Sequence, residues 1–253
     1  MGQIRIDRLR RALGTLIAFS IDAPDARRAH AGLDAAWTAI GRVDALMHPA
    51  RAGSDLARLN AAAVGEPVDV DPWTVTLLRR VCELHGDSQG VFDPCLPAAP
   101  GTLEDLELRD DGSLVRRAAL RIDLGGVAKG YAIDRAIEAL ADAGCSAALL
   151  NAGGDLRVWG ARADDIEVGR AGGPRLRLAD AAFAVSAPSA HAPAEHQGFY
   201  CRVPGRQRTA VAAAVLAPTA MLADALTKCV LFMEAEECAA LLARHGARRV
   251  QLP

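Results

Sequence analysis

The stretch from Arg121 to Leu140, RIDLGGVAKGYAIDRAIEAL, joins two different hydrophobic patterns at a pair of glycines. Apolar and polar residues alternate over 120–124, as they do in a half-buried strand. Apolar residues then recur at helical spacing up to a stop signal at Gly144. Gly125 and Gly126 separate the two patterns. The stretch therefore predicts a strand, a glycine turn and a helix.

A glycine turn that leads into a helix is a candidate phosphate-binding site. The first amides of a helix are unpaired donors with partial positive charge, and glycines allow a ligand to approach the backbone closely. Lys129 would add a full charge one turn into the helix, and Asp123 could accept a hydrogen bond from a ribose or a base. The same turn is also a common packing device, and the chain has neither a G-x-G-x-x-G sequence nor a P-loop. Both interpretations stay open on these residues alone.

The rest of the chain interleaves strand and helix patterns, with no repeat and no clear linker. Strands are predicted over 13–21, on both sides of a turn at 152–154, up to 216, and around Asp111-Gly112. Helices are predicted over 29–47, from 54, from 71 to 86, and in two pieces separated near 234. This order favours an α+β or mixed α/β fold in a single domain over 1–253, with one lobe or two.

Composition excludes several classes of function. The 253 residues are 51% hydrophobic and 24% charged, with a net charge of -2, which indicates a globular chain without a broad basic surface for nucleic acid or anionic lipid. No apolar run reaches the length of a spanning helix, and the first residues lack a signal-peptide pattern. We expect no membrane insertion and a cytoplasmic location, or a periplasmic one if the sequence is a piece of a longer protein. The six scattered cysteines are expected to be reduced thiols.

Six short motifs, taken together and in order, resemble the ApbE-like family, whose best-known members are FAD:protein FMN transferases. The main ones are DLGGVAKGYAIDRA, NAGGDLRVWG and ADALTK, and three further ones are ALGTLIAFSI, SDLARLN and GVFDP. Each motif alone is weak, but six in register cover most of the chain. The resemblance implies Mg²⁺-assisted transfer of FMN from FAD to a Ser or Thr of an acceptor flavoprotein, with release of AMP.

The resemblance also implies roles for individual residues. FAD would be bound by Met47, Asp123, Gly125, Gly126 and Lys129. A magnesium ion beside the diphosphate would be held by the Gly126 carbonyl, Asp224 and Thr227, and the implied catalytic residues are Asp224 and Lys129. Oxygen ligands of this kind suit a hard cation, which would neutralise the diphosphate and the leaving AMP.

The chain departs from the family pattern in several places. Lys228 follows Asp224 by four positions, where the family usually has a threonine, so the two could simply form an ion pair on a helix, or the ammonium could replace the metal. The family segment His-x-x-Asp-Pro-x-Thr-Gly is not found in 184–211, and a Trp-Gly element after the Phe-Asp block is missing too. An FAD-binding protein without transferase activity, acting as carrier, sensor or accessory factor, and an FAD pyrophosphatase are therefore alternatives.

Other polar and aromatic residues have local explanations. A solvated loop is expected to contain His191, Glu195 and His196, with a compensating base or metal site as the alternative. Asp155 is expected to be a turn residue more than a catalyst, and Asn151 to satisfy nearby backbone. Tyr131 is expected in the core. Asn60 is expected either to cap a helix or to contact the ligand.

Overall fold

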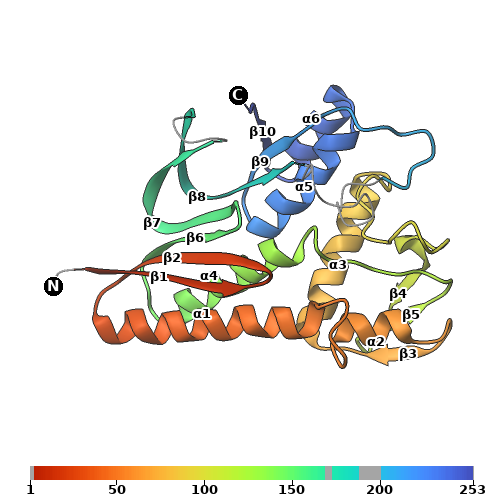
Figure 1. Ribbon diagram of the computed structural model, residues 1–253, viewed down its shortest axis with the longest axis horizontal. Coiled ribbons are helices and arrows are strands. Elements are labelled where there is room, and N and C mark those ends of the chain that lie inside the picture. The colour runs from red at the N-terminus through yellow and green to blue at the C-terminus, as the bar shows by residue number, and fades with distance from the viewer. Residues whose placement is uncertain (1–2, 169–172, 188–200, 253) are drawn as a thin grey trace.

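The computed structural model describes residues 3–168, 173–187 and 201–252 (Figure 1). All strand pairs in these residues are antiparallel, in a seven-stranded sheet of order β1-β2-β6-β7-β8-β9-β10 and a three-stranded sheet of order β3-β5-β4. The larger sheet consists of β1 Ile4–Ala12, β2 Thr15–Ala23, β6 Ala147–Ala152, β7 Asp155–Glu167, β8 Arg175–Ser186, β9 Ala213–Ala217 and β10 Arg248–Val250. The smaller sheet consists of β3 Pro67–Asp69, β4 Leu106–Leu108 and β5 Ser113–Arg116.

Helices cover one face of the larger sheet and flank the smaller one. They are α1 Ala26–Met47, α2 Asp55–Ala61, α3 Pro72–Asp87, α4 Ala128–Asp142, α5 Ala220–Phe232 and α6 Ala235–Arg244. Helices α1 and α4 pack against each other beside β1 and β2, α5 packs on β8 and β9, and α2 and α3 lie with the smaller sheet (Figure 1). The α+β class predicted from the sequence is confirmed. No helix in the described part of the chain is long and apolar enough to cross a membrane.

Side-chain caps fix several helix starts where the sequence predicts them. Ser54 accepts a hydrogen bond from the Ala57 amide at the start of α2. Asp71 accepts one from the Trp73 amide at the start of α3, with Pro72 as the first helical residue. These are short-range contacts, which is why the sequence alone locates them.

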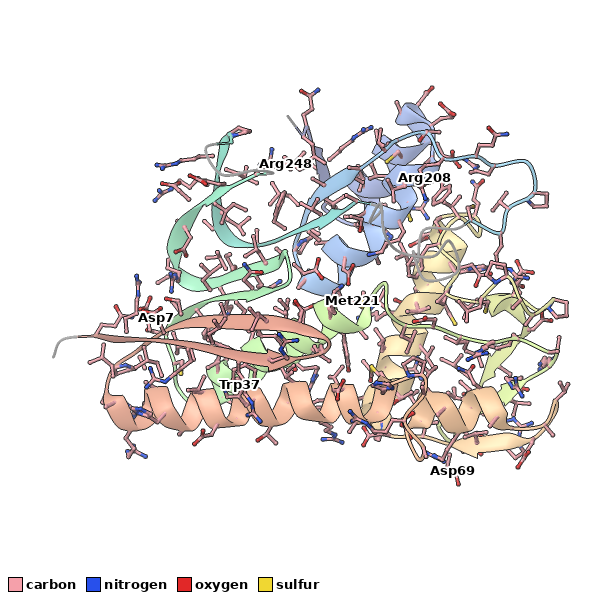
Figure 2. All side chains as sticks on the ribbon, viewed as in Figure 1. Asp7, Trp37, Asp69, Arg208, Met221 and Arg248 are labelled. Carbon is pink, nitrogen blue, oxygen red and sulfur yellow. The ribbon has the colours of Figure 1, made fainter. Side chains whose placement is uncertain are left out.

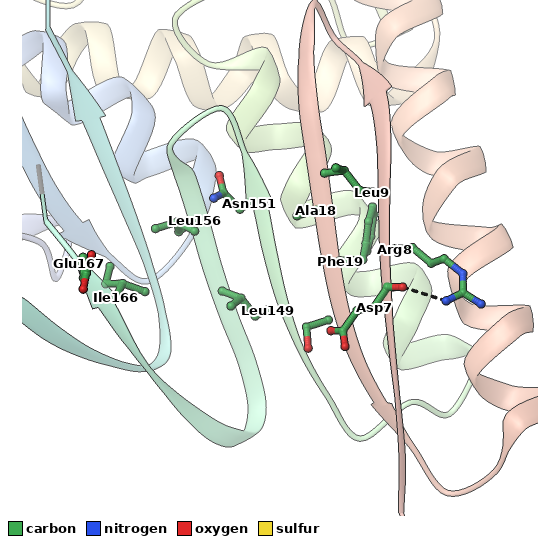
Figure 3. Close-up of a pocket in the computed structure, with 11 residues that line it drawn as sticks. Asp7, Arg8, Leu9, Ala18, Phe19, Leu149, Asn151, Leu156, Ile166 and Glu167 are labelled. Atoms are coloured by element: carbon green, nitrogen blue, oxygen red, sulfur yellow. Dashed lines mark hydrogen bonds between the residues drawn. The ribbon is translucent and has the colours of Figure 1, made fainter. Parts of the chain in front are cut away.

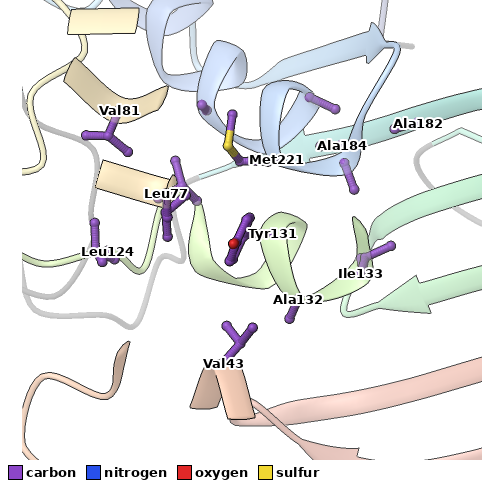
Figure 4. Packing of buried hydrophobic residues seen from close by; sticks show 14 of the residues in the cluster. Val43, Leu77, Val81, Leu124, Tyr131, Ala132, Ile133, Ala182, Ala184 and Met221 are labelled. Atoms are coloured by element: carbon purple, nitrogen blue, oxygen red, sulfur yellow. The ribbon is translucent and has the colours of Figure 1, made fainter. Parts of the chain in front are cut away.

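One hydrophobic core runs through both sheets and holds the central helices together. Figure 4 shows four of its members side by side, Val43 of α1, Leu77 of α3, Tyr131 of α4 and Met221 of α5. A second, smaller cluster around Val158 lies on the opposite face of the larger sheet. Because Ile122, Leu124 and the buried residues of α4 belong to the main core, the segments that flank the glycine turn are held by packing.

The first strand, β1, is absent from the sequence prediction. It pairs with β2 over the whole range Ile4–Ala12, and most of its residues are exposed. Arginines on both of its faces hide the alternation that identifies a half-buried strand. Trp37 of α1 lies beside this hairpin (Figure 2). It anchors the hairpin, since its ring centroid lies 4.6 Å from that of Phe19 in an edge-on contact, and the Arg10 guanidinium lies over its ring.

The strand predicted over 120–124 is wrong as an element of a sheet. The burial alternates as predicted, but the segment makes only one isolated bridge, between Ile122 and Cys95. On one edge the segment pairs with residues 94–96, since the Leu96 amide donates to the Arg121 carbonyl at 2.7 Å and the Asp123 amide donates to the Pro94 carbonyl at 2.9 Å. The side chain of Asn60 serves the other edge: its Nδ2 donates to the Ile122 carbonyl and its Oδ1 accepts from the Ile122 amide, both at 2.8 Å. Asn60 therefore braces the backbone just before the glycine turn, and these contacts are not a helix cap, while its contact with a ligand stays a prediction.

Candidate functional site

The glycine turn lies before the helix that it introduces. Asp123 Oδ1 accepts a hydrogen bond from the Gly125 amide at 2.8 Å, and α4 begins only at Ala128. The amides of Val127 and Ala128 both donate to the Leu124 carbonyl, so they are already paired. No side chain caps this helix. Gly125 is thus exposed and Gly126 is partly buried beside the start of α4, and the paired amides of α4 offer less to an anion than the sequence predicts.

Four charged side chains converge next to this turn from three separate elements. Lys129 Nζ of α4 lies 2.8 Å from Asp155 Oδ2 at the start of β7 and 3.4 Å from Asp224 Oδ2 of α5. Lys228 Nζ contacts Asp224 Oδ1 and donates to the Asp224 carbonyl at 2.8 Å. We call these four residues the lysine–aspartate cluster. Residues 129, 155 and 224 are far apart in the sequence, so only the fold brings them together.

The meeting of α4 and α5 sets the position of the cluster. Gly130 of α4 touches the first turn of α5 so closely that a Cβ at this position would lie 2.3 Å from the Ala220 carbonyl oxygen. One turn further along α4, the carboxylate of Asp134 accepts hydrogen bonds from the amides of Ala220 and Met221, both at 2.9 Å. A side chain of α4 therefore caps α5. The sequence analysis missed both contacts.

The turn between β6 and β7 places the second carboxylate. Gly153 and Gly154 have φ of 64° and 103°, a region that favours glycine, and Asn151 Oδ1 accepts from the Gly154 amide at 3.0 Å. A Cβ at Gly153 would lie 2.6 Å from Thr15 Oγ1, so the turn packs against the β1–β2 hairpin. The role predicted for Asn151 is confirmed. Asp155, which the sequence favours as a turn residue, is also an ion-pair partner of Lys129.

Burial and neighbouring charges shift the ionisation of the cluster. The side chains of Asp155 and Asp224 are 5% and 2% exposed. Burial, and then the charge of Asp224, raise the pKa of Asp155 to about 6, although Lys129 opposes the shift. Burial alone would lower the pKa of Lys129, but Asp224 and Asp155 outweigh it and raise that pKa above its usual value. With both aspartates ionised the four formal charges cancel, and a proton on Asp155 makes the cluster net positive.

The predicted magnesium ligands do not fit a divalent cation as they are arranged. Each carboxylate oxygen of Asp224 already faces an ammonium group. Thr227 Oγ1 donates to the Asp224 carbonyl at 2.6 Å and lies 2.6 Å from Ser186 Oγ. A Cβ at Gly126 would lie 3.2 Å from Lys228 Cε, so the lysine side chain covers the glycine whose carbonyl was predicted as a ligand.

The charges around the predicted site also oppose a divalent cation. Two unit charges about 4 Å apart interact by about 4 kcal/mol at an effective dielectric constant of 20, and a dication would repel a neighbouring ammonium by about twice that. Among the described residues, no group of three or more His, Cys, Asp or Glu side chains could hold a metal ion. The magnesium site of Gly126, Asp224 and Thr227 is therefore not supported by the arrangement of these side chains.

The remaining predicted residues lie apart from the cluster or outside the described part. Met47 is 4% exposed and belongs to the main core, so its contact with FAD stays a prediction. Tyr131 is buried and its hydroxyl donates to the Trp73 carbonyl at 3.2 Å, which confirms the core position. Residues outside the described ranges are His191, Glu195 and His196. The six cysteines are free thiols.

A separate cavity of about 620 Å³ lies on the sheet face that α1 and α4 leave uncovered (Figure 3). It lies across the adjacent strands β1, β2, β6 and β7, and its lining includes Asp7, Leu9, Ala18, Leu149 and Leu156. None of the residues predicted to bind FAD lines it. The cavity is therefore distinct from the lysine–aspartate cluster.

The fold and the cluster define an α+β protein with a candidate diphosphate site where two helices meet beside a glycine turn. The model of the ApbE family matches residues 13–102 and 98–188. The chain belongs to the ApbE family, as the motifs predicted.

Two bacterial FAD:protein FMN transferases are similar to parts of the chain. An FAD:protein FMN transferase of Treponema pallidum (strain Nichols) is 26% identical over 200 residues, which cover 65% of this chain and 55% of that protein. One of Rhodobacter capsulatus is 34% identical over 137 residues, which cover 43% of this chain and 26% of that protein. The chain thus spans about half the length of the first relative and about a quarter of the second.

Solved structures of two flavin transferases have the same fold. The apo form of the Pseudomonas stutzeri flavinyl transferase ApbE superposes with a TM-score of 0.78 at 19% identity, covering 97% of this chain and 90% of that one. The flavin transferase ApbE of Vibrio cholerae gives a TM-score of 0.78 at 19% identity, covering 97% of this chain and 92% of that one. At these identities the likeness supports the fold alone.

Proposed function

We propose that this chain is an FAD:protein FMN transferase that uses the lysine–aspartate cluster to hold the diphosphate of FAD. The observation that carries the proposal is the approach of Lys129 to Asp155 and Asp224 beside the Gly125–Gly126 turn. An open turn next to two ammonium groups suits a dianionic diphosphate, and membership of the ApbE family supports FAD as its source.

The proposed reaction is a phosphoryl transfer. The hydroxyl oxygen of a Ser or Thr in an acceptor flavoprotein bonds to the phosphorus of the FMN part. The bond from that phosphorus to the oxygen shared with AMP breaks, AMP leaves with the bonding electrons, and the hydroxyl proton is released. Positioning and charge neutralisation provide most of the acceleration in such reactions.

Each residue of the cluster has a role in this proposal. Lys129 neutralises negative charge on the diphosphate and on the leaving AMP, and Asp224 holds both ammonium groups in place. Asp155 orients Lys129 through their ion pair. Asp123 and the two glycines shape the turn against which the diphosphate lies. Magnesium has no part in the proposal, because Lys228 lies against the ligands that a metal would need.

Incubation with FAD and a flavoprotein acceptor tests the proposal. We expect AMP in solution and a flavin-fluorescent acceptor band on a denaturing gel, and we expect both to be lost in Lys129→Met. Arg80→Met removes an exposed cation that pairs with Glu83 on the same helix, and it should leave the labelling unchanged. Tight FAD binding without label on any acceptor would reject transfer.

One sequence observation favours a second function. The His-x-x-Asp-Pro segment of the family is not found in 184–211, a range that includes residues outside the described part. A protein that binds FAD without transferring it would take up one FAD per chain and release no AMP. An FAD pyrophosphatase would release free FMN together with AMP in the absence of acceptor. The cytoplasmic location expected from the sequence stays a prediction.

A further inference from the structure

We propose that the ammonium of Lys228 holds the place of a divalent cation in this site, so that diphosphate binding by this chain does not depend on Mg²⁺. The inference rests on the proposed function for the identity of the ligand, FAD. The replacement of the cation itself rests only on the contacts around Lys228.

The ammonium of Lys228 contacts two oxygen atoms of Asp224, and one of them belongs to the carboxylate that was predicted to bind the metal. Lys228 Nζ donates to the main-chain carbonyl of Asp224 at 2.8 Å and contacts its carboxylate oxygen Oδ1. The side chain runs across Gly126, since a Cβ there would lie 3.2 Å from Lys228 Cε and 3.9 Å from Nζ. One ammonium thus stands between the glycine turn and two oxygen atoms of α5. An ammonium group is a compact cation with three donors, and it can bridge oxygen atoms as a small metal ion does.

The distribution of basic residues supports a specific need for ammonium here. The chain has 29 lysines and arginines, but only Lys129 and Lys228 are lysines, and both contact Asp224. Every other cationic side chain that the sequence encodes, apart from histidine, is an arginine. A planar guanidinium cannot fill the same space as a point-like ammonium. The two lysines of the chain therefore both lie at the site where we propose that a compact cation is needed.

Exposure separates the two signs of charge within the cluster. The side chains of Lys129 and Lys228 are 30% and 13% exposed, whereas the side chain of Asp224 is 2% exposed. A diphosphate that approaches from solvent meets the ammonium groups first, with the carboxylates behind them. An ordinary ion pair between positions i and i+4 of a surface helix would expose both partners and would contribute nothing to a ligand.

The affinity for FAD, measured by quenching of flavin fluorescence in EDTA and in excess MgCl₂, tests the inference. The unchanged protein should bind FAD with the same Kd in both buffers, within about twofold. Lys228→Met should weaken binding by about tenfold or more in EDTA and recover part of the loss in MgCl₂, because Asp224 is then free to hold the metal. Arg80→Met serves as the matched control and should behave as the unchanged protein.

Binding of Mn²⁺ in the absence of FAD, followed by electron paramagnetic resonance, separates this inference from the proposed function. The unchanged protein should take up no Mn²⁺, and Lys228→Met should take it up. If the unchanged protein binds no FAD in either buffer, the proposed function fails, while refusal of Mn²⁺ would still support the replacement of the cation. Uptake of Mn²⁺ by the unchanged protein, or an EDTA-dependent loss of FAD affinity, would overturn the inference. Mn²⁺ uptake and the FAD affinity in EDTA, both measured on the unchanged protein, test the inference even if Lys228→Met does not fold.

Discussion

Asn60→Ala should destabilise the protein far more than the loss of one partly buried polar side chain would suggest. The substitution leaves the amide and the carbonyl of Ile122 without the partners that they have at 2.8 Å, and Ile122 is 0% exposed. An unsatisfied buried backbone group costs about 1–3 kcal/mol, so two of them give about 2–6 kcal/mol. Because Asn60 itself is only partly buried, water can reach the vacated space, and we expect the lower part, about 2–3 kcal/mol.

Urea unfolding followed by circular dichroism measures this difference, provided that the slope of the transition is unchanged. Asn151→Ala is the matched control, since it removes one hydrogen bond to the exposed Gly154 and should cost about 1 kcal/mol or less. Asn60→Ala should also weaken FAD binding, because the segment that it frees leads directly into Asp123 and the glycine turn. A free energy of unfolding within about 0.5 kcal/mol of the unchanged protein would refute the bracing role of Asn60.

Further outcomes are expected from substitutions and from changes of pH. Gly130→Ala should destabilise the protein and weaken FAD binding, because the new Cβ would lie 2.3 Å from the Ala220 carbonyl oxygen. The control is Gly41→Ala, whose Cβ would have no atom within 4 Å and which should stabilise the protein by about 1 kcal/mol in thermal unfolding. FAD affinity should rise as the pH falls through about 6, because protonation of Asp155 leaves the cluster with a net positive charge. If the FAD affinity of Asp155→Asn depends on pH as strongly as that of the unchanged protein, this reasoning is contradicted. By linkage, the raised pKa of Asp155 favours the folded state at acid pH, and this contribution is lost as the pH rises through about 6. Asp224→Asn should weaken FAD binding, because it loosens both ammonium groups, and an unchanged Kd by calorimetry would count against the cluster as the binding site.

Short-range signals made much of the fold predictable. The caps at Ser54 and Asp71, and the apolar spacing of α1 and α4, depend on neighbours a few residues away, so the sequence shows them directly. Strand β1 has exposed arginines where the alternating pattern should be, which concealed it. The segment 120–124 has the alternation of a strand, yet it pairs with other backbone only at one bridge, and a side chain 62 residues earlier serves its other edge. Burial alternation therefore predicts which way residues face, and does not by itself predict a sheet.

The site was predictable in its residues and less so in its geometry. The motifs identified Lys129 and Asp224 and drew attention to Lys228, but they gave Asp155 a minor role. Its pairing with Lys129 depends on the β6–β7 turn packing against the first hairpin, a contact between distant segments. The cap that Asp134 forms on α5 spans 86 residues to Ala220 and has no local signal. Long-range contacts of this kind are fixed by how helices and turns pack.

The backbone contact at Gly130 has a consequence for how the protein could change over evolutionary time. Lys129 lies one residue before the point where α4 touches α5, and Asp224 lies one turn beyond that point on α5. The contact between the two helices therefore sets the distance between Lys129 and Asp224. Surface loops could lengthen, shorten or be exchanged without altering that spacing. A slight tilt of either helix would instead change the distance between Lys129 and Asp224. Under the proposed function that change would weaken FAD binding while the protein stays folded, so retention of FAD would report helix alignment in a library of variants.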